Sequence, residues 1–413
     1  MKVILLTQYY PPEVGAPQNR LSATALSLHA QGAEVTVLTA MPNYPDMRIQ
    51  PAYRGKWHVR ETMAGMVVHR VWLVVTQRRS ILWRLFNYFS FVFSALFVGA
   101  VKLKRSDILF VESPPLFLGI TAMLLARMKG AKLVFNVSDL WPESAVQLGL
   151  VTNSMVIKLS TWLEERCYRS SALITGQTMG IVANIRERFP RKNILWLPNG
   201  VDFDAIRAAE QGPDPMEMRQ RSGIPAHALV LTYAGIIGHA QGLEVVLHAA
   251  VLLKDEPDVH FLLIGDGPEK AMLLQLRTQL AVERVHFVDR MPRAELLSLL
   301  RGTDAVVIPL RRNDLFKGAI PSKIFEALAL SKPLLLGVEG EAQQLFITEA
   351  KAGKAFIPED AASLAHAVRE VKKDPEGIIR MGAAGQQYVQ AHFDRVAINA
   401  RLWDALKKVI TAT

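Results

Sequence analysis

Residues 321–326 combine an anion-binding helix start with a carboxylate one turn away. Pro321 and Ser322 begin a predicted helix, so free backbone N–H groups and the positive end of the helix dipole favour a phosphate there. Glu326 follows roughly 6 Å further along the helix axis. A carboxylate at that distance can accept hydrogen bonds from the vicinal hydroxyls of a ribose. The spacing predicts a ribose-phosphate site, and an ordinary capped helix with a solvated glutamate is the alternative.

The flanking residues predict the elements that position this site. Apolar runs at Ala305–Pro309 and Leu334–Gly337 are predicted to be strands on either side of the helix. A strand, loop, helix and strand in this order make a parallel pair, with the loop at the carboxyl end of the first strand. Open α/β sheets bind ligands at that edge. We therefore expect the basic loop 310–320 to face the ligand.

A second glycine-containing loop follows another predicted strand. Gly235 and Gly238 permit a close backbone approach to a ligand. Residues 236–241 of this loop contain no Arg or Lys, and His239 is their one basic side chain. Lys317 and Lys323 are therefore the expected sources of positive charge for a diphosphate, and Lys323 is favoured over His239.

Three more candidate residues lie in loops that follow predicted strands. Gly15 stands before a predicted helix start, where backbone amides can bind a phosphate. Asp139 is expected to point into a cleft as a catalytic group, and its alternative role is to cap a helix that begins at Pro142. Arg290 is expected at the edge of a nucleobase, and the alternative is an ordinary surface arginine.

Short β-rich runs alternate with helical stretches through almost the whole chain, which predicts an α/β fold with two doubly wound, Rossmann-like domains. The other expected strands are Val3–Leu6, Glu34–Leu38, Ile108–Val111, Lys132–Val137, Leu173–Thr175, Ile194–Leu197, Leu229–Tyr233, His260–Ile264 and Val285–Val288. Residues 57–61 and 67–75 are expected to form a hairpin that turns near Ala64-Gly65. Pro198, Asn199 and Gly200 punctuate the pattern. The predicted domains are 1–197, joined by a C-terminal amphipathic helix at 395–413, and 198–394.

The net positive charge of the chain comes from its first half. The protein has 413 residues and a net charge of +10; residues 1–197 hold 23 Lys and Arg against 11 Asp and Glu, whereas residues 198–413 hold 25 against 27. A basic domain indicates an anionic surface or acceptor, such as anionic lipid or nucleic acid. No nucleic-acid-binding motif is recognisable, so nucleic acid is not an expected partner. The single cysteine and the short N-terminal apolar run, which predicts a strand and not a signal peptide, suit a cytoplasmic protein.

Leu85–Val101 is an apolar run of 17 residues rich in phenylalanine. It is flanked by Arg78 and Arg79 before it and by Lys102 and Lys104 after it. A membrane-spanning helix needs about 20 residues, and predicted strands of one sheet on both sides argue against a crossing. A buried packing helix is a second reading. The aromatic side chains and the basic flanks favour a third, a helix that lies in the membrane interface.

Residues 321–333 resemble the nucleotide-sugar motif of retaining family-4 glycosyltransferases, which have the two-domain GT-B fold, with the domains facing a cleft and a C-terminal helix crossing back to the first domain. In that family two glutamates eight positions apart contact the donor, the second on the ribose and the first on the sugar. Glu326 matches the second, and Gly318 stands where the first would be. The sugar contact is therefore left to other residues of 313–319 or to backbone amides, and the donor sugar is not identified.

Other stretches resemble the same family. Residues 11–16, Pro-Pro-Glu-Val-Gly-Ala, and residues 139–144, Asp-Leu-Trp-Pro-Glu-Ser, are similar to stretches of bacterial O-antigen and colanic-acid transferases in the fucosamine-transferase-like subgroup. In that subgroup the first stretch closes over the donor diphosphate, which implies a donor contact for Gly15. Gly265 and Gly267 look like the family's turn on the nucleobase side.

The resemblance implies a retaining enzyme that moves a hexosyl or N-acetylaminosugar residue from a nucleotide-sugar donor, expected to be UDP-linked. The aromatic apolar run at 85–101 and the basic first half of the chain together suit a lipid-linked acceptor, a saccharide on polyprenyl diphosphate. The expected pathway class is bacterial surface polysaccharide synthesis, of O-antigen, capsule or exopolysaccharide. Asp139, Lys323 and Glu326 are the expected catalytic residues. The expected location is the cytoplasmic leaflet of the cell membrane, to which the protein is bound peripherally.

No carboxylate or histidine pair has metal-ligand spacing after a predicted strand, so no metal site is assigned and amides and lysines are expected to stabilise the leaving diphosphate. No cofactor other than the donor substrate is expected. Two other functions fit the same motifs. One is a hydrolysing sugar-nucleotide 2-epimerase of GT-B fold, which needs no membrane contact. The other is a non-enzymatic protein that binds a sugar nucleotide.

Overall fold

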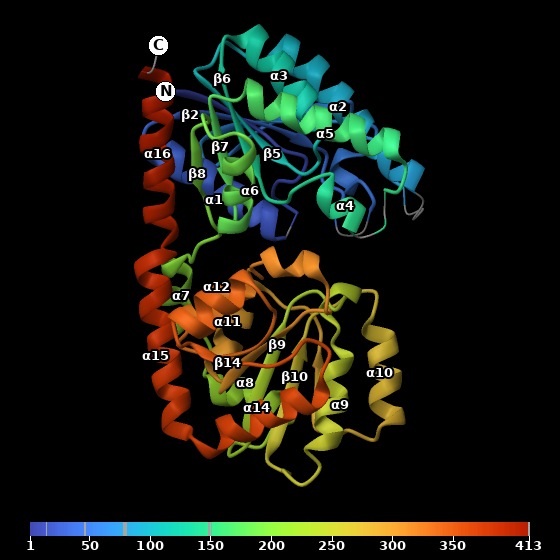
Figure 1. Cartoon of the computed structure of the whole chain (residues 1–413), viewed down its shortest axis with the longest axis vertical. Coiled ribbons are helices and arrows are strands. Elements are labelled where there is room, and N and C mark those ends of the chain that lie inside the picture. Colours follow the sequence, from blue (N-terminus) through green and yellow to red (C-terminus); the bar gives the residue numbers. More distant parts are fainter. Residues whose placement is uncertain (14, 45–46, 77–80, 148, 150, 412–413) are drawn as a thin grey trace. The chain divides into compact units, whose positions relative to one another are not determined.

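The computed structural model describes residues 1–13, 15–44, 47–76, 81–147, 149 and 151–411 (Figure 1). The chain forms two compact units. The first consists of Met1–Pro198 together with the chain from Val396 onward, and the second of Asn199–Arg395. Arg78 and Arg79, which the sequence places before the apolar run, lie outside the described residues.

The first unit is built on a sheet with eight strands among its described residues, in the order β3-β4-β2-β1-β5-β6-β7-β8. The strands are β1 (Lys2–Leu6), β2 (Glu34–Ala40), β3 (His58–Met63), β4 (Met66–Val71), β5 (Ile108–Ser113), β6 (Lys132–Val137), β7 (Leu173–Gly176) and β8 (Ile194–Trp196). Among these described strands only β3 runs antiparallel to its neighbour. The other pairs are parallel; for example, Leu5 lies opposite Val37 on one side and Phe110 on the other. The expected hairpin is therefore present, and β4 also joins the sheet beside β2.

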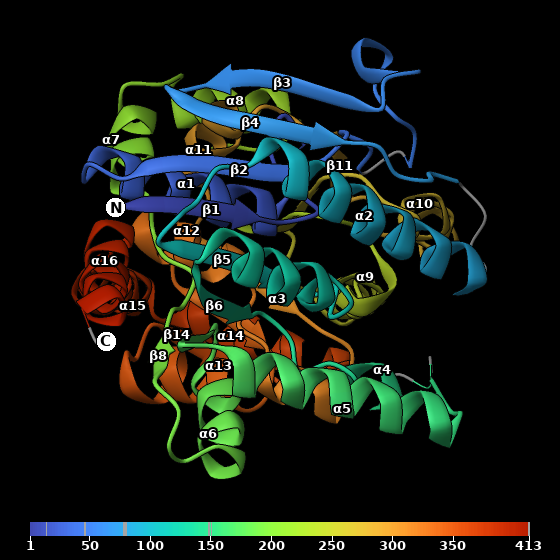
Figure 2. The ribbon, with the colours of Figure 1, turned by 90° about the horizontal axis from the view of Figure 1, so that it is seen from above.

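Two helical layers cover the first sheet because its strands alternate side chains between two cores. Ile4 and Leu6 enter one core, and Val3 and Leu5 enter the other. The first core is shared with α2 (Ile81–Lys102), α3 (Leu118–Lys129), α5 (Ser154–Ser170) and α6 (Met179–Arg188). Figure 2 shows α2, α3 and α5 together over one face of the sheet. The second core is shared with α1 (Ala16–Ala30) and α16 (Arg395–Thr411).

The second unit is built on a sheet of six parallel strands in its described part, in the order β11-β10-β9-β12-β13-β14. These are β9 (Leu229–Ala234), β10 (Val259–Ile264), β11 (Val285–Val288), β12 (Ala305–Pro309), β13 (Leu334–Gly337) and β14 (Gly353–Ala355). Its helices include α7 (Phe203–Glu210), α8 (Pro215–Arg221), α9 (Glu244–Leu252), α10 (Lys270–Gln279), α11 (Arg293–Arg301), α12 (Lys323–Ala329), α14 (Ala361–Lys373) and α15 (Pro375–His392). Strands β10 and β12 are buried along their whole length, as expected of a sheet covered on both faces.

The predicted fold class is confirmed, including the return of the last helix to the first domain. Ile398, Leu402 and Leu406 of α16 are buried in the core of the first unit. The expected strands agree with the observed strands to within two residues at each end, except that the second strand of the hairpin, expected at 67–75, ends at Val71. The short strand β14 was not expected, because its residues, Gly353, Lys354 and Ala355, include no β-branched or aromatic side chain.

Candidate active site

Lys323 places an amine beside the glycine loop that follows β9. Its Nζ lies 4.8 Å from the centroid of the Tyr233 ring, and a Cβ at Gly235 would stand 3.1 Å from its Cε. The residue is half-buried, and this burial lowers the pKa of the Lys323 amine to about 8. No carboxylate among the described residues forms an ion pair with it. An anion bound here would therefore stabilise the charged amine.

Gly235, Gly265 and Gly267 allow two backbone loops to touch. A Cβ at Gly265 would stand 1.9 Å from the carbonyl oxygen of Gly235, and a Cβ at Gly267 would stand 2.3 Å from that of Ile237. Gly235 and Gly265 also have φ values of 151° and 144°, which side chains rarely adopt. These glycines, named from the sequence as donor-binding residues, hold the two loops together beside Lys323.

The loop from Gly238 to Gly242 receives its positive charge from Arg311, which the sequence analysis did not select. Arg311 Nε donates to the carbonyl oxygen of His239 at 2.7 Å. Its guanidinium also pairs with Glu244 at 2.7 Å and Glu359 at 3.0 Å. Because two carboxylates already neutralise Arg311, Lys323 is the better candidate for a bound diphosphate.

Glu326 belongs to a chain of ion pairs that extends away from α12. Arg293 Nε donates to Glu326 Oε1 at 2.9 Å, and Arg293 Nη1 lies 3.5 Å from Asp202 Oδ2. Arg395 Nη1 lies 3.5 Å from the same Asp202 oxygen, and burial lowers the pKa of Arg395. A carboxylate has about four acceptor positions, so Glu326 can still accept from a ribose hydroxyl while Arg293 fixes its orientation. Arg293 lies 33 positions away in the chain, and no sequence signal pointed to it.

Pro321 and Ser322 lie directly before α12, as expected, and leave its first turn without a side-chain cap. Ser322 has helical backbone angles, and no described side chain caps the helix start. The N–H groups of Ile324 and Phe325 already donate to the carbonyl oxygens of Pro321 at 3.1 Å and Ser322 at 3.3 Å, so the amide of this turn that can meet a ligand is that of Lys323. Lys323, the first residue of the helix, and Glu326 lie one turn apart on it.

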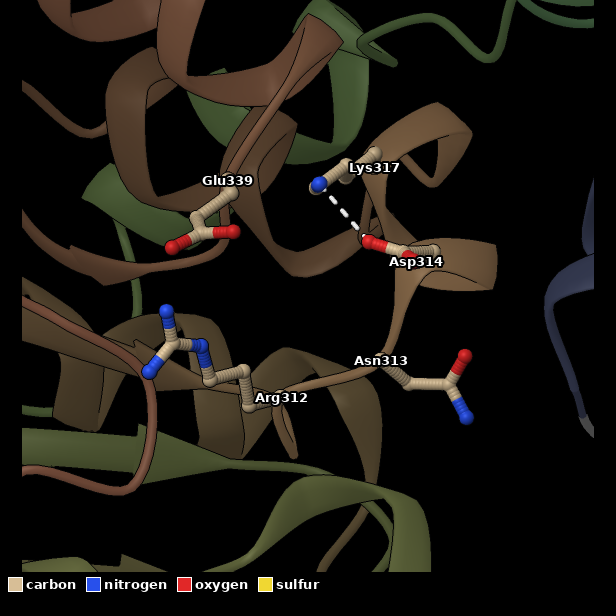
Figure 3. Close-up of a pocket in the computed structure, with 5 residues that line it drawn as sticks. All are labelled: Arg312, Asn313, Asp314, Lys317 and Glu339. Atoms are coloured by element: carbon tan, nitrogen blue, oxygen red, sulfur yellow. Dashed lines mark ion pairs between the residues drawn. The ribbon is translucent and has the colours of Figure 1, made fainter.

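Lys317 lines a polar pocket of about 350 Å³ beside the ends of β12 and β13, together with Arg312, Asn313, Asp314 and Glu339 (Figure 3). Lys317 Nζ lies 2.7 Å from Asp314 Oδ1, and this pair raises the pKa of Lys317. In Figure 3 the Arg312 guanidinium points to the side of the pocket that holds Glu339.

Gly318, the position of the family's first glutamate, lies in the same turn, η3 (Asp314–Gly318). A Cβ placed there would meet no heavy atom within 4 Å. The structure therefore has open space where a side chain at position 318 would begin.

Arg290 is exposed after β11, and its contact with a nucleobase stays a prediction. The neighbouring Asp289 pairs with Lys270 at 2.5 Å, and Lys270 Nζ also donates to the carbonyl oxygen of Gly265 at 3.0 Å. This edge of the second unit therefore holds an ordered lysine that the sequence analysis did not select.

Asp139 lies in the loop between β6 and the short helix α4 (Glu143–Gln147) of the first unit. Its Oδ2 accepts a hydrogen bond from Ser144 Oγ at 2.8 Å, and burial raises the pKa of its carboxyl. Asp139 therefore contacts a side-chain hydroxyl of α4. A carboxylate with a raised pKa is better suited to accept a proton near neutral pH.

Gly15 stands at the N-terminus of α1 with an extended backbone, next to the undescribed Val14. The loop before it is fixed by Glu13, which is buried and accepts hydrogen bonds from the backbone N–H groups of Asn43 at 2.6 Å and Tyr44 at 2.8 Å. Burial raises the pKa of the Glu13 carboxyl. The stretch that resembles a donor-closing loop is therefore held in place by a buried carboxylate.

A second buried carboxylate, Glu112 at the end of β5, connects the Gly15 and Asp139 segments. It pairs with Arg20 of α1 and accepts from Ser138, the residue before Asp139. Arg20 Nη2 also donates to Ser138 Oγ at 2.7 Å, and Arg20 Nη1 to Gln177 at 2.9 Å. No sequence motif identified this network, because its members come from α1 and from the ends of separate strands.

The described residues contain no group of three or more His, Cys, Asp and Glu side chains arranged to hold a metal ion. Of the residues named from the sequence, Lys323, Glu326, Gly235, Gly265 and Gly267 come together in the second unit. Gly15 and Asp139 belong to the first unit.

Comparison with known proteins identifies the class of enzyme. Residues 15–200 match a family described as "Glycosyl transferase 4-like domain", and residues 215–388 match "Glycosyl transferases group 1". The chain belongs to the group 1, family-4 glycosyltransferases, a retaining family of nucleotide-sugar-dependent enzymes, and it has the GT-B fold.

Individual relatives cover nearly the whole chain. WcaI of Escherichia coli (strain K12), named as a colanic acid biosynthesis glycosyl transferase, is 25% identical over 96% of this chain and 97% of its own length. Sucrose-phosphate synthase of Thermosynechococcus elongatus superposes with a TM-score of 0.75 at 17% identity, covering 100% of both chains. HepE of Anabaena, solved in complex with UDP and glucose, gives a TM-score of 0.72 at 17% identity and covers 99% of this chain and 100% of its own.

Proposed function

We propose that this glycosyltransferase moves a hexosyl or N-acetylaminosugar residue from a UDP-sugar to a saccharide on polyprenyl diphosphate at the cytoplasmic leaflet of the membrane. The product would serve bacterial surface polysaccharide synthesis. The similarity to WcaI supports the pathway class, and the UDP and glucose bound to HepE support the donor class. The observation that carries the acceptor assignment is an exposed aromatic stripe on helix α2.

On the donor side, Lys323 and the first turn of α12 would bind the diphosphate, and Glu326 would bind the ribose. The half-buried Lys323 amine lacks a carboxylate partner among the described residues, so a diphosphate would supply the missing charge. As the glycosidic bond breaks, charge grows on the leaving diphosphate, and a fixed amine stabilises that charge without reorganisation. On the acceptor side, Asp139 would accept the proton of the attacking hydroxyl.

The aromatic stripe consists of Phe86, Phe89, Phe93, Phe97 and Val101, which recur three or four positions apart on the outer side of α2. Their exposed fractions are 61, 37, 69, 64 and 63%. The opposite side of the helix is buried in the core of the first unit. A soluble surface rarely presents so many large apolar side chains together, and such patches mark interaction sites.

The neighbouring helices α3 and α5 extend the apolar surface. Leu124 and Met128 of α3 and Met155, Leu159 and Trp162 of α5 are exposed, Met155 at 77%. Helices α2, α3 and α5 pack on the same sheet face and form one outer layer, to which these exposed residues belong.

Exposed basic residues accompany the apolar side chains of this layer. They are Lys102 and Lys104 at the end of α2, Arg127 on α3, and Lys158 and Arg166 on α5. Apolar side chains mixed with cations complement an anionic lipid surface, each basic residue contributing about 1 kcal/mol near such lipids.

Helix α2 meets the length and composition of a membrane span over Leu85–Lys102, with a mean hydropathy of 1.5. However, 39% of that window is buried inside the protein, and parallel strands β1 and β5 on either side of α2 in sequence are adjacent in one sheet. A crossing would separate these paired strands. The geometry therefore favours a helix that lies in the membrane interface.

A vesicle experiment tests the proposal. The wild-type protein should sediment with phosphatidylglycerol-containing vesicles, and with UDP-sugar it should label polyprenyl-diphosphate-linked saccharide carried by them. Full activity on a water-soluble saccharide, with no gain from the lipid carrier or vesicles, would contradict the acceptor assignment. Conversion of the UDP-sugar to its 2-epimer would favour the epimerase alternative, and binding without any turnover would favour a non-enzymatic protein.

A further inference from the structure

Three aromatic rings from separate elements form a row in the first unit. The Phe89 ring of α2 lies 4.8 Å, centroid to centroid, from the ring of Phe117, which precedes α3. The Phe117 ring lies 5.6 Å from that of Trp141, which follows β6, with an interplanar angle of 68°. The contacts of this aromatic row therefore join α2 to the loop that carries Asp139.

The aromatic row is only partly covered by protein. Phe89 is 37% exposed, and Phe117 and Trp141 are half-buried against the core shared by α2, α3 and α5. Rings that served packing alone would gain more from full burial. The exposed parts of the row leave apolar surface for a ligand.

The two ends of the row point to the chemistry of that ligand. Phe89 belongs to the aromatic stripe proposed to contact lipid, whereas Trp141 lies two positions after Asp139. A ligand that follows the row has one end in the apolar phase and its other end at a polar, reactive carboxylate. A long hydrocarbon chain that ends in a phosphorylated saccharide fits these two ends.

We propose that Phe89, Phe117 and Trp141 bind the isoprenoid chain of the polyprenyl diphosphate acceptor and direct its diphosphate-linked saccharide to the Asp139 loop. This inference rests on the proposed function, which it deepens by assigning the acceptor's lipid to particular residues. Branched, unsaturated isoprene units pack against aromatic faces and edges, and burial of that apolar surface supplies the affinity. The row also explains the use of aromatic residues on three elements that are far apart in sequence.

Substitution of Trp141 provides the first test. The probe is undecaprenyl diphosphate in phosphatidylethanolamine and phosphatidylglycerol vesicles at high salt, compared with the same vesicles without it. The wild type should bind the loaded vesicles more tightly, and Trp141→Leu and Phe117→Leu should lose roughly tenfold of that affinity, equal to about 1.4 kcal/mol. Trp141→Phe, which keeps an aromatic ring, should retain most of it.

Trp57→Leu is the matched control, because Trp57 is 51% exposed and stacks on Trp72, outside the row. It should bind loaded vesicles like the wild type. Wild-type affinity for loaded vesicles in both Trp141→Leu and Phe117→Leu would overturn the proposal. An equal loss in Trp57→Leu would overturn it as well, because the effect would not be specific to the row.

A second measurement uses the wild-type chain, so it does not depend on the folding of a variant. A benzophenone-bearing isoprenoid diphosphate should crosslink to peptides that contain Phe89, Phe117 or Trp141. Crosslinks confined to other peptides would overturn the proposal.

Turnover separates this inference from the proposed function. If the wild type glycosylates the lipid-linked saccharide, Trp141→Leu should raise the acceptor KM about tenfold and leave the donor KM unchanged. If the wild type glycosylates the lipid-linked saccharide and Trp141→Leu has an unchanged acceptor KM, the role proposed for the aromatic row is overturned and the proposed function is not. If the wild type transfers sugar to a water-soluble saccharide but not to a lipid-linked one, the proposed function is overturned, and the role proposed for the aromatic row is overturned with it.

Discussion

Lys323 is the residue with the clearest physical reason to meet an anion. Its amine is half-buried beside Gly235 and Tyr233, and burial lowers its pKa to about 8. The unfolded chain would hold that amine at its ordinary, higher pKa. Between about pH 8 and that higher pKa the unfolded state therefore binds more protons, so this group makes the protein more stable as pH rises through that window. Below about pH 8 the folded protein holds this half-buried amine in its charged form, which lowers the stability of the fold. Groups with pKa values perturbed in this way are typical of functional sites.

The pKa of Lys323 predicts the pH dependence of activity. The value of kcat/KM for the donor, which reports on the free enzyme, should fall above about pH 8, because the Lys323 amine then loses the positive charge that binds the diphosphate. Lys323→Arg keeps its charge, so its kcat/KM, although lower, should not fall in that range. A pH profile of the two enzymes provides the measurement, and parallel falls in both would assign the effect to another group.

Glu326→Ala should weaken donor binding by roughly 1–3 kcal/mol while the fold is retained, because charge-assisted hydrogen bonds to the ribose would be lost. Calorimetry with the UDP-sugar measures the change. Arg293→Ala is the matched variant, since it removes the partner of Glu326 but not the carboxylate. If Glu326 served only this ion pair, both variants would leave donor affinity unchanged.

At the scale of elements, the sequence predicted the strands well because central parallel strands are continuous apolar runs. Strands β10 and β12 agree with the expected ranges to within one residue. Local motifs also predicted the neighbours of Lys323, since Gly235 and Gly265 directly follow strands. Strand β14, with three residues, lacked such a signal.

Other parts of the site depend on contacts between distant segments. Arg293 reaches Glu326, Arg311 reaches His239, and Glu112 joins Arg20 to Ser138. The members of each pair are many residues apart, and each residue alone has the character of an ordinary polar or charged residue. The pairing requires the topology of the sheet, so a single sequence could not predict it.

Substitutions on the exposed side and on the buried side of helix α2 should have opposite effects on membrane binding and on stability. Replacing Phe93 and Phe97 with Ser should remove the salt-resistant part of vesicle binding and leave the thermal midpoint nearly unchanged, because these rings are 69 and 64% exposed. Phe91→Ser, on the fully buried side, should destabilise the protein by several kcal/mol, roughly 3–5 as for other large core truncations. Vesicle sedimentation and thermal melts provide the measurements. A folded double variant that still sediments at high salt would exclude α2 as the membrane contact.

At the scale of the whole molecule, both units are built on mainly parallel sheets, and their candidate residues lie in the segments that follow the strands. Charge divides the two units: the excess of basic residues falls in the half that presents the aromatic stripe, whereas the half that contains Lys323 and Glu326 is nearly neutral. This division suits an enzyme that meets an anionic surface with one domain and binds a soluble nucleotide with the other.

The enzyme should work without a divalent metal, since Lys323 and backbone amides are proposed to stabilise the leaving diphosphate. Turnover in excess EDTA should equal turnover in magnesium. Loss of activity on chelation, followed by recovery with magnesium or manganese, would contradict this prediction.

Transfer measured with one saccharide in two forms tests the central claim most directly. The same acceptor sugar is offered on undecaprenyl diphosphate in phosphatidylglycerol vesicles and as a water-soluble glycoside, with labelled UDP-sugar as donor. We predict a kcat/KM at least tenfold higher for the vesicle-borne acceptor, and loss of that advantage when Phe93 and Phe97 are both replaced by Ser. Equal kcat/KM for the two forms, or an advantage that survives both substitutions, would contradict the proposed action of this enzyme at the membrane.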